Sequence, residues 1–488
     1  MKKRVKVFVA VGLAAIMSMA ALAGCGSKSS GDTAKTAAKS TDEVKKPDNI
    51  SWFINVGLIL DDGADKWKEE YTKLTGIPLE FTPQSNNEYD QNLELAFASK
   101  KAPDVFNLRG ADQLALYAQQ GALADLTDLV KASGLYTEEN KSVWDSVTIN
   151  GKIYGVPFEL NTGTITYVRK DWLDKVGMKA PTNYNEYIEM LRAFKTKIPE
   201  CKTPFTAPGL YDKEALTYLK EFYQDASPEI TNVGGKWVDG MSQDNMKGAL
   251  QRMQDAYKEG LIDTEVVTNT TSACRDKWYA GSVGVFNYWA GTWAVSLDNR
   301  LKTNVPTAQT VGINVIKEAK YDLRVPAVTC IAASSKNIPG AFKYFVQYMH
   351  DGGEGQALFE YGVEGTHWKQ DGDHVTMLPK PSNKKESLEK SFITSYCSLV
   401  PMKDANKNVK LDDRIVSSNE ILKKDGVQKK SQPVSKKLTK INADLTKLKS
   451  KVISKVVMGG TTVEEGMKDY IAESKNLGIE DVIKEMNK

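Results

Sequence analysis

Short runs of β-branched and aromatic residues alternate with amphipathic segments from Ile50 onward. Such runs, bounded by glycine, proline or polar residues, predict β-strands. The expected strands cover residues 51–56, 78–82, 104–108, 153–158, 164–168, 283–288, 311–316 and 325–333. The strand at 283–288 lies within the sequence VGVFNYWAGTW, which places three large aromatic residues within six positions. Periodicity alone does not decide whether these rings fill the core or face a ligand.

Between the expected strands, apolar residues recur every three or four positions, which predicts amphipathic helices. One helix follows a capping residue at Thr182 or Asn183, and another spans 244–259 and stops at Gly260. Further helices are expected at 64–74, near 114–117 and at 341–349, and about the last hundred residues are expected to be largely helical. The alternation predicts an α/β fold with a mostly parallel sheet. Ligands of such folds bind beyond the carboxyl ends of the strands.

The first 24 residues have the features of a signal peptide. Basic residues at positions 2, 3, 4 and 6 precede an apolar run, 7–23, that ends in small residues. Leu22-Ala23-Gly24-Cys25 resembles the bacterial lipobox, in which the cysteine is acylated and becomes the mature N-terminus. The resemblance implies that Cys25 carries lipid, including palmitate, and that the protein is anchored to a membrane rather than spanning it. Residues 25–47 carry no aromatic residue and predict a flexible tether.

The charge balance argues against a nucleic-acid partner. The formal net charge of +3 includes the four basic residues of the predicted signal peptide, so the mature chain has a net charge of −1. A nucleic-acid-binding protein needs a basic face. The lysines between 403 and 455 are matched by acidic residues, which is typical of a solvated helical surface.

The cysteines and histidines give little sign of a metal site or a catalytic centre. Cys201, Cys274, Cys330 and Cys397 form no CxxC pair, which predicts no structural metal and leaves their pairing in an exported protein open. The chain has three histidines and no GxSxG nucleophile motif. The run from His367 to His374 has ligand-type residues, but Asp371-Gly372 within it predicts a hairpin turn. A two-carboxylate glycosidase leaves no sequence signature and stays an alternative.

One long segment resembles the central part of family 1 extracellular solute-binding lipoproteins of sugar ABC importers. It reads NGKIYGVPFELNTGTITYVRKDWLDKVGMKAPTNYNEYIEML. Other segments resemble this family in the same order: TGIPLEF, PDVFNL, QQGALADLTDLV, YKEGLID, YGVEGTHW and VMGGTTVEEGMKDYIAESKNLGIEDVI. The length and YGVEGTHW are most similar to the large Gram-positive subgroup, which includes oligosaccharide-binding members. KIPECKTPFTAPGL stands where some alginate-binding relatives carry a calcium loop, so no calcium is expected there.

The resemblance implies a type II periplasmic-binding-protein-like fold with two α/β lobes and a hinge. The expected lobes combine 48–160 with 305–350, and 161–304 with 351–488. The implied function is capture of a sugar or oligosaccharide in an interlobe cleft and delivery to the permease of an ABC transporter. The implied protein is a monomer without cofactor or catalysis, anchored by lipid on the extracellular face of a Gram-positive cell membrane. The alternatives are a secreted carbohydrate-active enzyme and a lipoprotein that binds a peptide or another solute.

The resemblance also implies which residues contact the ligand. In maltose-binding relatives a glycine-rich strand delivers a tryptophan that stacks on sugar, and Trp289 is the match here. A flat ring suits the C–H face of a sugar, and polar side chains suit its hydroxyls. The further candidates are Asn161, Glu159, Trp293, Tyr288, Asn107, Arg109, Glu364, Trp368 and Tyr361. Each has an alternative as a core, turn or surface residue, and for Tyr288 and Trp293 the core alternative has equal weight.

Overall fold

The computed structural model of the chain describes residues 44–55, 60–84, 88–158, 162–211, 218–382, 399–428, 432–433 and 435–488. Residues from Val44 to Lys488 form one compact unit. This unit contains two hydrophobic cores, each built around its own sheet. Cys25, Glu159, Asn161 and Cys397 lie outside the described residues.

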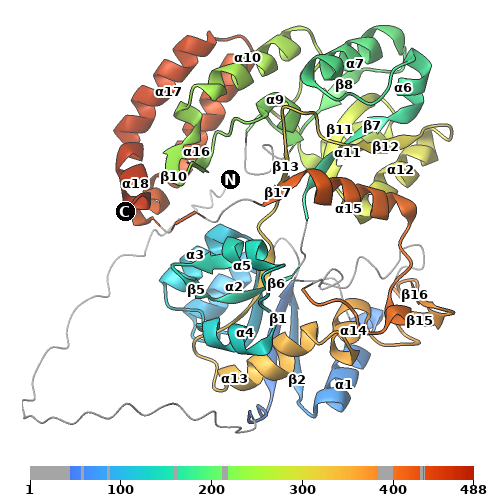
Figure 1. Cartoon of the computed structure of the whole chain (residues 1–488), viewed down its shortest axis with the longest axis vertical. Helices are drawn as coiled ribbons and strands as arrows, with labels where there is room; N and C mark the ends of the chain where they lie inside the picture. The colour runs from blue at the N-terminus through green and yellow to red at the C-terminus, as the bar shows by residue number, and fades with distance from the viewer. Residues whose placement is uncertain are drawn as a thin grey trace, which may run out of the picture. The chain divides into compact units, whose positions relative to one another are not determined.

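The first sheet has the strand order β2-β1-β3-β14-β6. Its strands β1, β2 and β6 are labelled in Figure 1. Its strands are β1 (Ile50–Asn55), β2 (Leu79–Gln84), β3 (Val105–Leu108), β6 (Gly155–Phe158) and β14 (Ala327–Ile331). The first three strands are parallel, whereas β14 is antiparallel to both β3 and β6. Every residue of β3 and β14 is buried, as expected for strands in the middle of a sheet covered by helices, and every residue of the edge strand β6 is buried as well.

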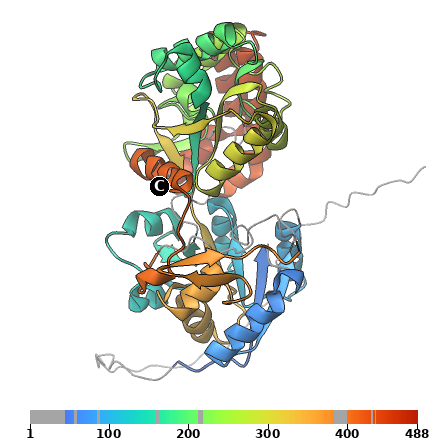
Figure 2. The same ribbon diagram turned by 90° about the vertical axis from the view of Figure 1, so that its right-hand side faces the viewer.

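The helices of the first core come from two separate parts of the chain. The first part gives η1 (Leu60–Asp62), α1 (Ala64–Thr75), α2 (Tyr89–Ala98), α3 (Ala111–Gln119), α4 (Thr127–Ser133) and α5 (Lys141–Val147), with the short pair β4 (Thr148–Ile149) and β5 (Lys152–Ile153). The second gives α13 (Ile338–Ala341), η3 (Phe342–Gln347), η4 (Tyr348–His350) and α14 (Glu354–Tyr361). The two parts meet in an aromatic cluster, in which the Trp67 indole of α1 donates to the Leu358 carbonyl of α14 at 2.8 Å. Helix α1 packs against β2, and the blue helix beside the blue strands in Figure 2 belongs to this N-terminal part of the chain.

The second sheet has the strand order β12-β7-β11-β8. Its strands are β7 (Thr164–Arg169), β8 (Thr203–Thr206), β11 (Val283–Trp289) and β12 (Thr310–Ile313). Only β8 and β11 are parallel, since β7 is antiparallel to both β11 and β12. Helices α6 (Lys170–Val176), α7 (Tyr184–Lys197), α9 (Lys220–Tyr223), α10 (Asn245–Lys258), α11 (Thr271–Tyr279) and α12 (Thr292–Asn304) belong to this part. So do the hairpin β9 (Ile230–Val233) and β10 (Lys236–Asp239) and the turn η2 (Gly240–Ser242).

The C-terminal segment adds a helical layer to the second core. Its elements are η6 (Ala405–Lys407), α15 (Asp413–Asp425), β17 (Gly426–Gln428), α16 (Lys436–Val457), α17 (Val463–Leu477) and α18 (Ile479–Met486). Helix α16 packs on α10 and α17, and the three lie side by side in Figure 1. Strand β17 pairs in parallel with β13 (Tyr321–Leu323). A separate hairpin of β15 (Trp368–Asp371) and β16 (His374–Met377) pairs Asp371 with His374.

The chain passes from one core to the other after Phe158, after Leu323 and after Leu399. The first two crossing segments run side by side, with Gly163 and Leu323 forming an antiparallel bridge. The Arg324 amide donates to the Thr162 carbonyl at 2.8 Å. A Cβ atom on Gly163 would lie 2.6 Å from the Asp322 carbonyl oxygen. Close approach of the two segments therefore requires glycine at this position.

The observed elements confirm the predicted strands and helices and correct three expectations. The sheets are mixed rather than mostly parallel, because several strands enter after the chain has crossed between cores. Residues 342–347 form a π-helix instead of α-helix, although Phe342, Phe345 and Val346 are buried as expected. The expected lobe boundaries also differ from the packing. Ile313 and Tyr321 pack in the second core because β12 pairs with β7, and Leu358 and Phe359 pack in the first.

Candidate ligand-binding site

Trp289 is the last residue of β11 and is partly exposed. Its neighbour Tyr288 is 2% exposed and packs with Phe286, at 5.0 Å between ring centroids. Successive side chains of a strand point to opposite faces. The strand end therefore places Tyr288 in the core and leaves Trp289 on the other face.

The backbone around Trp289 is held by hydrogen bonds from three directions. The Tyr167 hydroxyl donates to the Trp289 carbonyl at 3.0 Å. The Ala290 amide donates to the Gly163 carbonyl of the crossing segment at 3.0 Å. The Gly291 amide donates to the Ser418 hydroxyl of α15 at 2.9 Å. These bonds fix the indole relative to the crossing segments.

A buried polar group lies two residues before Trp289, on the same face of the strand. Asn287 pairs with Thr166 of β7, and both side chains donate to the fully buried carboxylate of Glu221. The distance from Asn287 Nδ2 to Glu221 Oε2 is 3.0 Å. Burial raises the pKa of Glu221, and the two hydrogen bonds lower it in part. The network ties α9 to the two strands that support Trp289.

Arg324 lies beside the Trp289 ring. Its guanidinium carbon lies 5.8 Å from the ring centroid, within the range of a cation–π contact. Its Nη2 donates to the backbone carbonyl of Arg109 at 2.9 Å. Arg324 follows β13 in a crossing segment, so it joins the end of β11 to the region after β3.

Trp293 lies in the first turn of α12 and is partly exposed. The guanidinium carbon of Arg275, on α11, lies 5.2 Å from the Trp293 ring centroid and 5.9 Å from that of Tyr288. Arg275 Nη1 donates to the Tyr288 hydroxyl at 3.1 Å. The two rings therefore differ in burial. Tyr288 packs inside the second core, whereas Trp293 is partly exposed at the edge of that core.

Asn107 and Arg109 lie near each other but in different surroundings. Asn107 lies inside β3 rather than after it and is 2% exposed, with its amide donating to the Thr329 hydroxyl at 3.0 Å. Arg109 follows the strand and pairs with Asp90 at 2.8 Å. Its guanidinium carbon also lies 5.5 Å from the Tyr89 ring centroid. Of the two, Arg109 is the one that the structure brings toward Trp289, through its carbonyl contact with Arg324.

Tyr361 and Trp368 form a small apolar cluster of their own with Val375. The Trp368 indole donates to the Gly362 carbonyl at 2.8 Å, and Glu364 is exposed. His367 is buried, its Nδ1 accepts from the Val363 amide and its Nε2 donates to the Asp62 carbonyl, both at 2.8 Å. Burial lowers the pKa of this imidazole. The YGVEGTHW turn thus packs against η1, and no contact of the described residues joins it to Trp289.

The described residues include no group of three or more His, Cys, Asp or Glu side chains placed to hold a metal ion. Cys201, Cys274 and Cys330 carry free thiols. The predictions for Glu159, Asn161 and Cys25 fall on residues outside the described part. No described helix is both long and apolar enough to cross a membrane.

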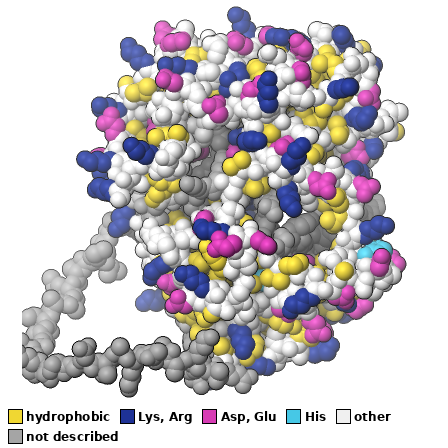
Figure 3. Space-filling view, viewed as in Figure 1, with side chains coloured by type: hydrophobic (Ala, Val, Ile, Leu, Met, Phe, Trp, Pro, Cys, Tyr) yellow, Lys and Arg dark blue, Asp and Glu magenta, His cyan; other side chains and the backbone are white. Residues whose placement is uncertain are grey.

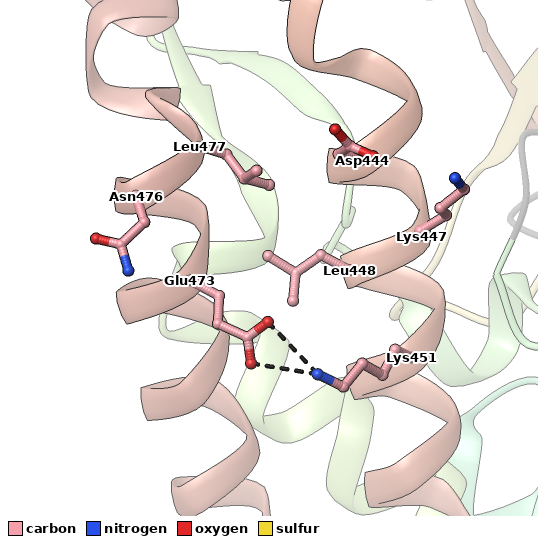
Figure 4. Close-up of a pocket in the computed structure, with 7 residues that line it drawn as sticks. All are labelled: Asp444, Lys447, Leu448, Lys451, Glu473, Asn476 and Leu477. Atoms are coloured by element: carbon pink, nitrogen blue, oxygen red, sulfur yellow. Dashed lines mark hydrogen bonds and ion pairs between the residues drawn. The ribbon is translucent and has the colours of Figure 1, made fainter.

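A surface groove of about 400 Å³ lies elsewhere, between α16 and α17 (Figure 4). Leu448 and Leu477 line it together with Asp444, Lys447, Lys451, Glu473 and Asn476. Lys451 and Glu473 form an ion pair across it at 3.4 Å. The groove lacks an aromatic ring, and its side chains are paired or solvated. The groove therefore offers no aromatic surface on which a sugar could stack.

Basic and acidic side chains are intermixed on the face shown in Figure 3. Lys and Arg do not gather there into a continuous basic surface. This distribution agrees with the nearly balanced charge of the sequence, which has 65 basic and 62 acidic residues.

The fold and the site define a class of two-lobe α/β binding proteins. The chain matches the family of bacterial extracellular solute-binding proteins over residues 60–349, more than half of its length, and it belongs to this family. It is 23% identical over 338 residues to the polygalacturonan/rhamnogalacturonan-binding protein YtcQ of Bacillus subtilis, which covers 66% of this chain and 67% of that protein. It is 22% identical over 303 residues to the fructooligosaccharide ABC transporter substrate-binding protein FusA of Streptococcus pneumoniae, 56% of each chain. The chain thus matches about half to two thirds of the length of these curated relatives.

Solved structures show the same fold over nearly the whole chain. An alginate-binding protein without calcium ion aligns with a TM-score of 0.64 at 19% identity, covering 91% of this chain and 97% of that one. A solute-binding protein from Bifidobacterium longum infantis aligns with a TM-score of 0.67 at 17% identity, covering 90% and 97%. These likenesses confirm the predicted fold class.

Two residues of the site were not predicted from the sequence. Arg324 is an isolated arginine between two strands, and only the pairing of the crossing segments brings it to Trp289. Glu221 lies in a short helix of four residues and is buried by strands that are distant in sequence. The sequence does offer one signal for Arg324. It begins an Arg-Val-Pro sequence that follows a strand, at the point where the chain passes from one core to the other.

Proposed function

We propose that this solute-binding protein captures a sugar or oligosaccharide on the Trp289 ring and delivers it to the membrane permease of an ABC importer. Family membership supports capture of an extracellular solute. The names of the two relatives above describe carbohydrate binding, which supports a carbohydrate as the solute. The observation that carries the proposal is a partly exposed indole at the end of a fixed strand, beside the crossing segments.

The chemistry of the Trp289 region suits a sugar ring. A sugar has C–H groups on its faces and hydroxyls around its rim, which match an aromatic plane surrounded by hydrogen-bonding groups. Because the crossing segments hold the backbone of Trp289, rotation of the lobes would open and close the space over the ring. Ligand binding would then favour a closed state, which is the form that docks on the permease. The protein would return the sugar unchanged, in contrast to a glycosidase.

Trp289→Ala is expected to weaken oligosaccharide binding by about tenfold, since a stacked ring contributes on the order of 1.5 kcal/mol. The measurement is isothermal titration of the mature domain with a panel of oligosaccharides, followed by chromatography of the recovered sugar. Trp237→Ala is a matched control, because Trp237 is also a partly exposed tryptophan at a strand, in β10. Its backbone amide, which the substitution keeps, donates to the side-chain oxygen of Asn487. Binding of peptides but not of sugars, or cleavage of the sugar, would replace this function with one of the alternatives.

We also propose that Cys25 is acylated and holds the protein on the extracellular face of the cell membrane. The lipobox-like LAGC sequence and the tether-like composition of residues 25–47 support this. Cys25→Ser is expected to move the protein from the membrane fraction to the culture medium, and to abolish incorporation of an alkyne-labelled palmitate. Retention of the variant protein in the membrane fraction would contradict lipid anchoring through this residue.

A further inference from the structure

The arginines of the described chain differ in what they face. Arg109, Arg169, Arg192 and Arg414 lie within ion-pair distance of carboxylates. Arg324 and Arg275 instead lie against Trp289 and Trp293, and among the described residues no carboxylate pairs with either. Arg252 and Arg300 also face rings, but those rings are the tyrosines Tyr184 and Tyr279. The two tryptophans nearest the end of β11 thus each carry a guanidinium whose charge is not matched by an acid.

Arg324 is the more informative of the two. Its side chain is exposed, and its hydrogen bond goes to a neutral backbone carbonyl. Asp322, two residues before it, faces the Lys220 ammonium at 3.1 Å. Because a carbonyl does not neutralise a guanidinium, the positive charge beside Trp289 is available to an anion from solution. A guanidinium presents two parallel N–H groups that match a carboxylate, and such charge-assisted pairs are among the stronger hydrogen bonds.

A uronic acid ring would satisfy both groups at once. Its C–H face suits the indole, and its carboxylate stands at the rim of the ring, where a guanidinium on the same indole can reach it. A neutral sugar would take water from the Arg324 guanidinium without supplying an opposite charge. The geometry points to an acidic oligosaccharide, one that carries ring carboxylates, as the solute, with Arg324 as the residue that selects for the carboxylate. This inference rests on the proposed function.

The test compares sugars that differ only in the carboxylate. Trigalacturonate and trimannuronate are titrated against galactotriose and mannotriose, the matched sugars with a hydroxymethyl group, using the wild-type mature domain, Arg324→Gln and Arg324→Lys. Arg300→Gln is the control, because Arg300 is an exposed arginine on a tyrosine ring of the same part of the protein. Unfolding temperatures of all variants are measured first.

We expect one of the acidic trisaccharides to bind at least about tenfold more tightly than its neutral partner, in a salt-dependent manner. Arg324→Gln should remove this preference, Arg324→Lys should keep part of it, and Arg300→Gln should leave it unchanged. Equal binding of acidic and neutral sugars, or binding of neutral sugars alone, overturns the inference and leaves the proposed function intact. So does an Arg324→Gln variant that weakens both kinds of sugar by the same factor. Failure of all sugars, acidic and neutral, overturns the proposed function as well.

Discussion

Trp289 and Tyr288 are adjacent in the chain and have opposite surroundings. Tyr288 is enclosed by rings of the second core, whereas Trp289 lies at the surface of the strand end with Arg324 against it. Alternation along β11 produces this difference, and the loop that follows stops the strand before a further residue can cover the indole. The proposed platform thus combines a backbone held by hydrogen bonds with a partly exposed ring at the end of a strand.

The carboxylate of Glu221 makes the support of this strand end sensitive to pH. Burial raises its pKa above the ordinary value of 4.5. Below pH 4.5 its contribution to stability is fully present, and it is lost as the pH rises through the folded-state pKa, because the unfolded chain releases the proton more readily. Glu221→Gln should therefore gain stability relative to wild type as the pH rises from about 5 to about 8. The Asn287 Oδ1 atom, which has no partner, can accept from the new amide after a flip.

Thermal unfolding of wild type and Glu221→Gln across this pH range measures the effect, and the difference in unfolding temperature is expected to move in favour of the variant as the pH rises. A difference between the two proteins that stays constant with pH would show that Glu221 does not titrate abnormally in the folded state.

At the scale of elements, the crossing segments determine whether the site can form. Gly163 lets the segment after β6 approach the segment after β13, and this approach places Arg324 beside Trp289. A methyl group at this position would meet the Asp322 carbonyl oxygen and Leu422.

Gly163→Ala should therefore destabilise the protein by about 1–3 kcal/mol, as expected for an overpacked site, and should weaken sugar binding. Gly110→Ala is the matched control, because its backbone is extended and a Cβ atom there meets no atom within 4 Å. Denaturant unfolding of both variants makes the comparison. Equal free energies of unfolding for Gly163→Ala and Gly110→Ala would contradict the requirement for glycine between the crossing segments.

Sequence patterns predicted the elements well wherever the determinant was local. Asn183 caps α7 through the Glu186 amide, and the Asp371-Gly372 signal forms the hairpin of β15 and β16. The features that the sequence did not predict depend on contacts between segments that are distant in the chain. The direction of β12 and β14 in their sheets and the burial of Glu221 depend on pairing between distant segments. The contact of Arg324 with Trp289 has the same origin, since no periodicity along the chain encodes it.

At the scale of the whole molecule, the chain crosses three times between two separately packed cores. Each core has its own sheet and aromatic cluster, so the proposed closure would move the cores as bodies while their interiors stay packed. The residues that would contact a solute come from the ends of strands and from the crossings. This arrangement suits the proposed capture and release of a solute.

We propose Trp289 as the surface on which the solute lies. A crystal structure of the mature domain with the sugar that binds most tightly in titration tests it most directly. One sugar ring is expected in van der Waals contact with the Trp289 indole, with Arg324 within hydrogen-bond distance of the same sugar. A sugar bound in the groove between α16 and α17, with Trp289 bare, would contradict it.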